Sequence, residues 1–270
     1  MKLFVEGVGV LGSGLNGWPA SQAILTGAAP WVDTALAIPP SDLLPPAERR
    51  RTGLPVKLAL AVGYEAVAQS QRNAAELPAV FASSAGDGDN MHYIFDMLSQ
   101  NGREVSPTRF HNSVHNAPSG YWSIATKSRA PTMSLACFDA SFVAGLIEAA
   151  TQTLASGNAV ALIAYDTPYP QPLHATRPIS TSFGVALVMV GNRTDRSLVE
   201  LEITISRNSN ASTAMADAGL EALRTGTPAA RSLPLLAALA SPDAEKSAAT
   251  NGIYLDYVSG NQLVVAVRRC

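Results

Sequence analysis

The sequence has few of the residues that mark metal-binding, disulfide-bonded or strongly charged proteins. It contains only two cysteines, Cys137 and Cys270, which cannot build a disulfide framework, and neither has another cysteine or a histidine at zinc-binding spacing. Charged residues make up 15% of the 270 residues and the formal net charge is −2, which does not favour nucleic acid or an anionic membrane as a partner. We expect no bound metal and no cofactor.

Long apolar runs are missing as well. The apolar stretch after Lys2 is interrupted by Glu6 and by glycines, so a secretory leader is not expected. The longest runs, such as residues 159–165, have the length of a strand and fall well short of the ~20 residues that cross a membrane. Together with the scarcity of cysteine, this predicts a cytoplasmic protein that does not insert into a membrane.

Hydrophobic residues, by contrast, make up 47% of the chain, which is enough to bury a large core. Their spacing predicts helices at 55–71, 91–98 (capped by Asp89 or Asn90), 120–127 and 142–156. Strands are predicted at 3–10, 79–83, 133–137, 159–165, 185–190, 198–205, 253–258 and 262–267, the last two joined by a turn at 259–261. Residues 208–213 and 240–251 are predicted connections. Helices that alternate with apolar strands indicate an α/β sheet covered on both faces.

Two local motifs have a more ordinary explanation than ligand binding. Residues 7–12 satisfy the G-x-G-x-x-G pattern of dinucleotide-binding folds, but Gly14, Gly17 and Pro19 prevent the helix that such a site requires from starting there. We expect these glycines to form a strand-to-loop turn. The basic run at 49–51 follows two prolines and is predicted to be a solvated loop.

Cys137 is the candidate nucleophile. It stands at the end of a predicted strand and just before a predicted helix, where helix-terminus amides lower a thiol pKa and can hold an oxyanion. Free cysteine is also among the most buried residue types, so a packing role is the alternative. His111 and His115 are four residues apart, but no carboxylate accompanies them and Pro118 follows, which argues against a metal site. Their polar surroundings predict a loop that caps the helix at 120–127.

The region before Cys137 resembles the stretch that leads to the nucleophile of β-ketoacyl synthases, in the thiolase superfamily. The similar segments are FHNSVHNA at 110–117, GYWSIA at 120–125 and APT at 130–132, with further similarity at 4–9, at 166–170 and at Arg177-Pro178 before 184–190. The resemblance implies a thiolase-like α/β fold, a mixed sheet with helices on both faces, in one domain over 1–270. The resemblance further implies that residues 1–190 are the complete N-terminal, synthase-like core and that 191–270 are a reduced C-terminal portion.

Two departures from the synthases matter. Aligning the helix at 142–156 with the corresponding family helix places the nucleophile position at Ala140, and keeping Cys137 there would require about three extra residues between elbow and helix. Condensing synthases also need two histidines from their C-terminal half, whereas this chain has no histidine after Gly191. The resemblance therefore implies a protein with no catalytic residues of its own.

The opening FVEGVGVLGSG at 4–14 with Trp18, and SVHNA with GYWSIA at 113–125, resemble ketosynthase chain-length factors of bacterial aryl polyene type II polyketide systems. Such a subunit pairs with an active β-ketoacyl synthase as a heterodimer, works with an acyl carrier protein and helps to shape the acyl tunnel. The residues implied at the partner interface or tunnel are Phe110, Asn112, His115, Asn116, Met133 and Phe138. For the three apolar residues Phe110, Met133 and Phe138, core packing is the alternative.

Two other functions remain open at this point. One is a self-sufficient acyltransferase or thioesterase-like enzyme that uses Cys137 with His111 or His115. The other is a homodimeric scaffold without a synthase partner.

Overall fold

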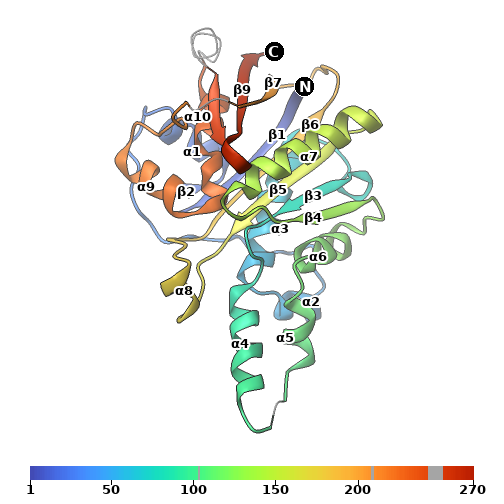
Figure 1. Cartoon of the computed structure of the whole chain (residues 1–270). Coiled ribbons are helices and arrows are strands. Elements are labelled where there is room, and N and C mark those ends of the chain that lie inside the picture. Colours follow the sequence, from blue (N-terminus) through green and yellow to red (C-terminus); the bar gives the residue numbers. More distant parts are fainter. Residues whose placement is uncertain (103, 208–209, 243–251) are drawn as a thin grey trace.

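The computed structural model describes residues 1–102, 104–207, 210–242 and 252–270. Among them, nine strands form one mixed sheet in the order β4-β3-β5-β6-β1-β7-β9-β8, with β2 paired to β1 off this path (Figure 1). The strands are β1 (Lys2–Gly12), β2 (Leu15–Asn16), β3 (Ala79–Ala82), β4 (Thr132–Leu135), β5 (Val160–Asp166), β6 (Phe183–Val190), β7 (Val199–Ser206), β8 (Ile253–Asp256) and β9 (Gln262–Arg269).

All eight predicted strands are present, and among the described residues the two-residue β2 is the one strand that was not predicted. β3 pairs in parallel with β4 and with β5, while the remaining neighbours in the sheet are antiparallel. β5 explains why several strands are apolar throughout: Leu162 and Ala164 belong to the core on one face, and Ile163 and Tyr165 to the core on the other.

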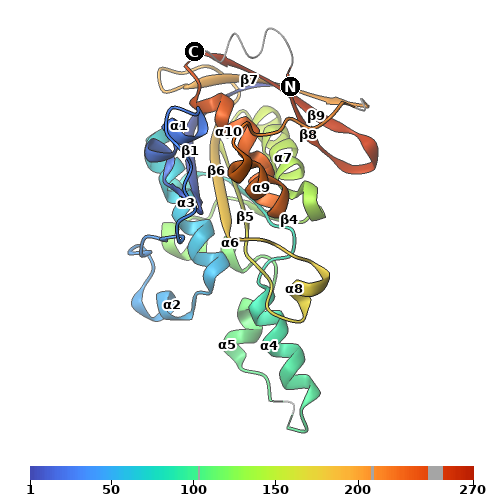
Figure 2. The same ribbon diagram turned by 90° about the vertical axis from the view of Figure 1, so that its left-hand side faces the viewer.

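Helices pack on both faces of the sheet and complete an apolar core on each face. They are α1 (Trp18–Leu25), α2 (Pro46–Arg51), α3 (Leu54–Ser70), α4 (Gly88–Ser99), α5 (Pro107–Asn112), α6 (Ala117–Thr126), α7 (Ser141–Ser156), α8 (Leu173–Thr176), α9 (Ala218–Gly226) and α10 (Leu233–Ala240), with 3₁₀ turns η1 (Ala74–Glu76), η2 (Phe138–Ala140), η3 (Pro228–Ser232) and η4 (Val258–Gly260). α3 and α6 cover one face, and α1, α7, α9 and α10 cover the other. α4 and α5 project together from the body (Figures 1 and 2). None of the described helices has the length and apolar character needed to cross a membrane.

The glycines of the N-terminal motif lie within β1 and not in a turn after it, which corrects the sequence-based expectation. A Cβ on Gly7 would stand 1.9 Å from the Ala66 carbonyl oxygen, and one on Gly9 would stand 2.1 Å from that of Val62. Because α3 packs this closely on β1, only glycine fits at these two positions.

Two further expectations need correction. The basic run at 49–51 ends the short helix α2, where Pro46 opens the first turn and Arg51 pairs with Glu48, and it does not form a loop. α4 is capped by Asp87, which accepts a hydrogen bond from Asn90 N at 3.0 Å, and not by Asp89 or Asn90. The predicted connections at 208–213 and 240–251 lie partly outside the described residues.

Candidate functional site

The carboxyl ends of β3, β4 and β5 meet at one end of the sheet, which is where α/β proteins place their sites. Ser83 and Ser84 follow β3, residues 136–140 follow β4, and Asp166 ends β5. These three segments contain the candidate nucleophile and most of the polar groups that the structure brings together around it.

The segment between β4 and α7 forms a sharp strand-to-helix elbow. Phe138 has a φ of 50°, a conformation that is strained for a residue with a large side chain. The Ser141 hydroxyl, at the start of α7, accepts from Cys137 N at 2.9 Å and donates to Phe138 O at 2.7 Å. Nucleophile elbows have this kind of turn, with the reactive residue in the strained position. Here that position holds Phe138, and Ala140 is the N-cap of α7, so neither residue offers a nucleophilic atom.

Four side chains fix the elbow, and we call them the elbow clamp: Phe138, Asp139, Arg177 and Arg231. The Arg177 guanidinium lies 3.5 Å from the centre of the Phe138 ring. Asp139 accepts from Arg177 Nη2 at 2.7 Å and from Arg231 Nη2 at 2.9 Å. An exposed aromatic ring in a strained backbone is thus held in one place by two arginines from distant parts of the chain.

Asp166 joins the sheet to the segment that covers its end. It is fully buried and accepts from Ser84 N at 2.8 Å, Ser84 Oγ at 2.7 Å, Ser83 Oγ at 3.2 Å and Ala229 N at 2.9 Å. Burial outweighs these hydrogen bonds and raises the pKa of Asp166 to about 6. The sequence carried a usable signal, because an acidic residue that ends an apolar strand is unusual.

The two histidines do not meet Cys137 in any hydrogen bond among the described residues. α5 ends at Asn112, so His111 and His115 do not share a helix. His111 is exposed, and its ring lies edge-on to Tyr121 with centroids 6.3 Å apart. His115 Nε2 lies 3.1 Å from Ser83 O. Cys137 is half-buried and free. The described residues also contain no group of three His, Cys, Asp or Glu placed to hold a metal ion.

Exposed apolar side chains occur on β4, the last strand of the sheet, on the segment from α5 to α6, and at the elbow. Among the described residues, β4 pairs with β3 and with no other strand. Phe110, Met133 and Phe138 have exposed fractions of 64%, 42% and 62%. With the exposed Val114 and Ile124 they form what we call the β4 patch. An unpaired strand edge beside apolar side chains is a surface that favours pairing with another chain.

The asparagines expected near this surface have different surroundings. Asn112 is buried, where it donates to Arg51 O at 2.7 Å and accepts from Tyr121 Oη at 2.9 Å. Asn116 is exposed at the start of α6, but its side chain makes no cap hydrogen bond, so the expected capping of this helix is absent. The two hydrogen bonds of Asn112, by contrast, connect α5 to α2 and to α6 in the interior.

Comparisons with known proteins identify the family. A search of curated proteins found no significant match. The family described as "Beta-ketoacyl synthase, N-terminal domain" matches residues 18–251. A solved ketosynthase in complex with its chain length factor from Xenorhabdus doucetiae is similar to this chain at 19% identity, with a TM-score of 0.73 over 98% of this chain and 99% of that chain.

Two further structures extend the comparison. The ishigamide ketosynthase/chain length factor has 15% identity and a TM-score of 0.70 over 99% of each chain. The ketosynthase from module 1 of the bacillaene synthase from Bacillus amyloliquefaciens has 13% identity and a TM-score of 0.54 over 78% of this chain and 47% of that chain. At these identities the similarity establishes the thiolase-like α/β fold, and the family match spans most of the sequence. The chain belongs to the β-ketoacyl synthase N-terminal domain family.

Proposed function

We propose that the chain is a non-condensing, chain-length-factor-like subunit in the cytoplasm. It pairs with an active β-ketoacyl synthase and shapes the tunnel for an acyl chain delivered by an acyl carrier protein, in type II polyketide synthesis of the aryl polyene kind. The observation that carries the proposal is the elbow, which keeps the turn of a synthase while neither Phe138 nor Ala140 supplies a nucleophile. Condensation needs an activated thiolate and donors that hold an enolate, and no histidine follows His174.

The extent of the structural matches supports a partner subunit. The chain aligns end to end with a chain of two ketosynthase/chain length factor complexes, at 99% of that chain in each case. It covers only 47% of the bacillaene ketosynthase chain. The share of each matched chain that is covered thus supports the proposed function, in addition to the missing nucleophile.

The β4 patch is the proposed synthase interface. Strand addition at the free edge of β4 would satisfy its unpaired backbone groups, and the partner would cover Met133 and Phe138. Because the elbow clamp holds Phe138 in place, little ordering entropy is lost when a partner packs against it. In this arrangement the Phe138 ring faces the region where an acyl chain crosses between the subunits.

The first test is co-expression with an active synthase encoded beside this gene, followed by size-exclusion chromatography. We expect the two chains to elute together and the Met133→Asp variant to elute alone. Ile205→Asp is the matched control, since Ile205 is 50% exposed on β7, away from β4. Separate elution of the unmodified chains, or the same loss in both variants, would contradict the proposal.

The second test separates this function from a thiol enzyme. The chain is incubated with iodoacetamide and with a carrier-bound acyl thioester, and Cys137 is examined by mass spectrometry. We expect no transfer of the acyl group to Cys137 in the absence of the synthase. Rapid, pH-dependent acylation of Cys137 would instead establish the acyltransferase or thioesterase-like alternative.

A further inference from the structure

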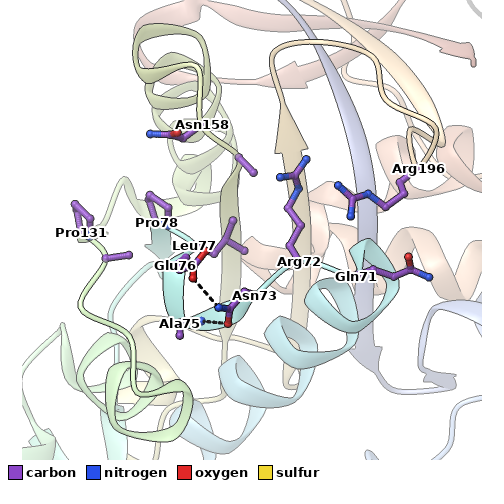
Figure 3. Close-up of a pocket in the computed structure, with 12 residues that line it drawn as sticks. Gln71, Arg72, Asn73, Ala75, Glu76, Leu77, Pro78, Pro131, Asn158 and Arg196 are labelled. Carbon is purple, nitrogen blue, oxygen red and sulfur yellow. Dashed lines mark hydrogen bonds between the residues drawn. The ribbon is translucent and has the colours of Figure 1, made fainter.

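A hollow of about 710 Å³ lies at the other end of the sheet, where β3, β4 and β5 begin. Its walls come from the turn after α3, from the segments that precede β4 and β5, and from the turn between β6 and β7 (Figure 3). Its volume is within the range of ~300–1,000 Å³ that is typical of small-molecule sites. Neither the elbow nor the β4 patch includes any of its residues.

A buried carboxylate holds one of the arginines that line the hollow. Glu6 is the extra residue of a β-bulge in β1, between Val5 and Gly7, and its side chain is 0% exposed. It accepts from Arg72 Nε at 2.5 Å, from Arg72 Nη2 at 3.0 Å and from Thr194 Oγ1 at 2.5 Å. Bulges often re-aim a side chain at a functional site, and this one directs Glu6 toward the arginine. Arg72 is thereby held in one orientation, with Nη1 outside this pair of hydrogen bonds.

A second arginine reaches the same place from another element. Arg196, in the turn between β6 and β7, has Nε 4.0 Å from Glu6 Oε1, and its side chain is 40% exposed. Figure 3 shows the ends of Arg72 and Arg196 next to each other at the hollow. In the part of the chain that the structure describes, Glu6 is the one carboxylate within 4.0 Å of either guanidinium.

The positive charges of Arg72 and Arg196 exceed the negative charge of Glu6. Two guanidinium groups share one carboxylate, which leaves one positive charge beside the hollow. Glu76 also lines the hollow, but its carboxylate accepts from Asn73 Nδ2 at 3.0 Å and, among the described residues, forms no ion pair with either arginine. The remaining guanidinium N–H groups face a space lined by the amides Gln71, Asn73 and Asn158.

We propose that this hollow binds a small phosphate monoester, with the phosphate between Arg72 and Arg196. A guanidinium donates two parallel hydrogen bonds to a phosphate, and the three terminal oxygens of one phosphate can accept from two such groups at once. The amides of Gln71, Asn73 and Asn158 would receive the polar body of the ligand. This site does not depend on the proposed function, because it lies at the opposite end of the strands.

The test uses the 270-residue chain with inorganic phosphate, glycerol 3-phosphate and acetate, each at matched ionic strength. Binding is followed by thermal unfolding and by calorimetric titration, since a ligand that binds only the folded chain raises its melting temperature. We expect both phosphates to raise the melting temperature and acetate to have little effect. Arg196→Gln should weaken the binding of phosphate by about tenfold, as expected for the loss of a charged hydrogen-bond donor.

Arg193→Gln is the matched control, because Arg193 is exposed in the same turn but does not line the hollow. It makes the same change in net charge and should leave phosphate binding unchanged. Equal weakening in the two variants would show that the general positive charge of the turn attracts phosphate. That result, the absence of any phosphate effect in the unmodified chain, or an equal effect of acetate would overturn the proposal.

Discussion

Two parts of the molecule hold a carboxylate between two arginines, and they differ in how much water reaches them. At the elbow, Asp139 lies between Arg177 and Arg231, and its side chain is 33% exposed. At the other end of the sheet, Glu6 lies between Arg72 and Arg196 and is 0% exposed. Both clusters combine one carboxylate with two guanidinium groups, so burial is a main difference between them.

Burial decides what each cluster contributes. A charge taken out of water is strongly destabilising if it loses its partner, whereas an exposed ion pair adds little stability. Glu6 should therefore contribute to the stability of the sheet. Asp139 should mainly set the position of Arg177 and, through it, of the Phe138 ring.

The largest expected effect is that of Glu6→Gln. Breaking one partner of a buried ion pair costs about 3–5 kcal/mol, and here it also leaves Arg72 without its carboxylate. Urea unfolding should show this loss, with Glu76→Gln as the control, because Glu76 is exposed in the same region. A loss of unfolding free energy below about 1 kcal/mol would mean that the buried Glu6 cluster contributes no more stability than an exposed ion pair.

The second effect concerns pH and Asp166. Its pKa is raised by burial from 3.8 to about 6, so the folded chain holds a proton more tightly than the unfolded chain between these values. Stability should therefore fall as pH rises through this window, by up to about 3 kcal/mol. In Asp166→Asn this slope should be absent. An unchanged slope in the unfolding free energy measured at pH 4–7 would show that another group titrates.

The pH dependence of stability that Glu6 contributes should have the opposite sign to that of Asp166. Burial raises its pKa, but the hydrogen bonds from Arg72 and Thr194 and the two arginine charges outweigh this and hold the pKa below 4.5. Its contribution is present above the unfolded pKa and is lost as pH falls through the lowered folded pKa. Glu6→Gln should thus remove part of the acid-induced loss of stability, which the same pH series would detect.

A smaller effect is expected at Phe138, where a comparison of two substitutions isolates the energetic cost of the strained backbone. Phe138→Gly and Phe138→Ala both remove the ring and its contact with Arg177, but only alanine keeps a Cβ at a φ of 50°. The glycine variant should be more stable by about 1 kcal/mol in urea unfolding. Both variants should also weaken the proposed pairing with a synthase. Equal stability of the two would mean that the elbow is not strained.

The smallest effect is expected for Asp139→Asn. Its ion pairs are partly exposed, so the loss of stability should stay below about 1 kcal/mol and shrink further in high salt. Asp42→Asn, which removes the exposed pair with Arg49, is a suitable reference. A loss as large as that of Glu6→Gln would erase the distinction between the two clusters.

The sequence predicted the elements whose signal is local. β5 and β6 are runs of apolar residues, and α7 has an apolar stripe that ends at Gly157, which caps it with a φ of 71°. The helix α2 was missed because it has no buried residue, so no apolar periodicity marks it. The order of the strands could not be read from the individual segments, because neighbours in the sheet such as β6 and β1 are far apart in the sequence.

The candidate site was only partly predictable. The elbow at 136–140 and the exposed Phe110, Met133 and Phe138 came from the family resemblance. The elbow clamp did not, because Asp139 and Arg231 are 92 residues apart and no local pattern joins them. The buried role of Asn112 was missed for the same reason, since its partner Arg51 lies 61 residues away.

The free edge of β4 has a consequence for how the chain must be produced. A strand with unpaired N–H and C=O groups beside apolar side chains can add to the same strand of another copy, and the process need not close after two chains. The chain made alone should therefore be prone to precipitation, and its yield should depend on how soon after translation a partner covers that edge. For the partner subunit proposed above, solubility would then report on the presence of a partner more directly than any catalytic assay.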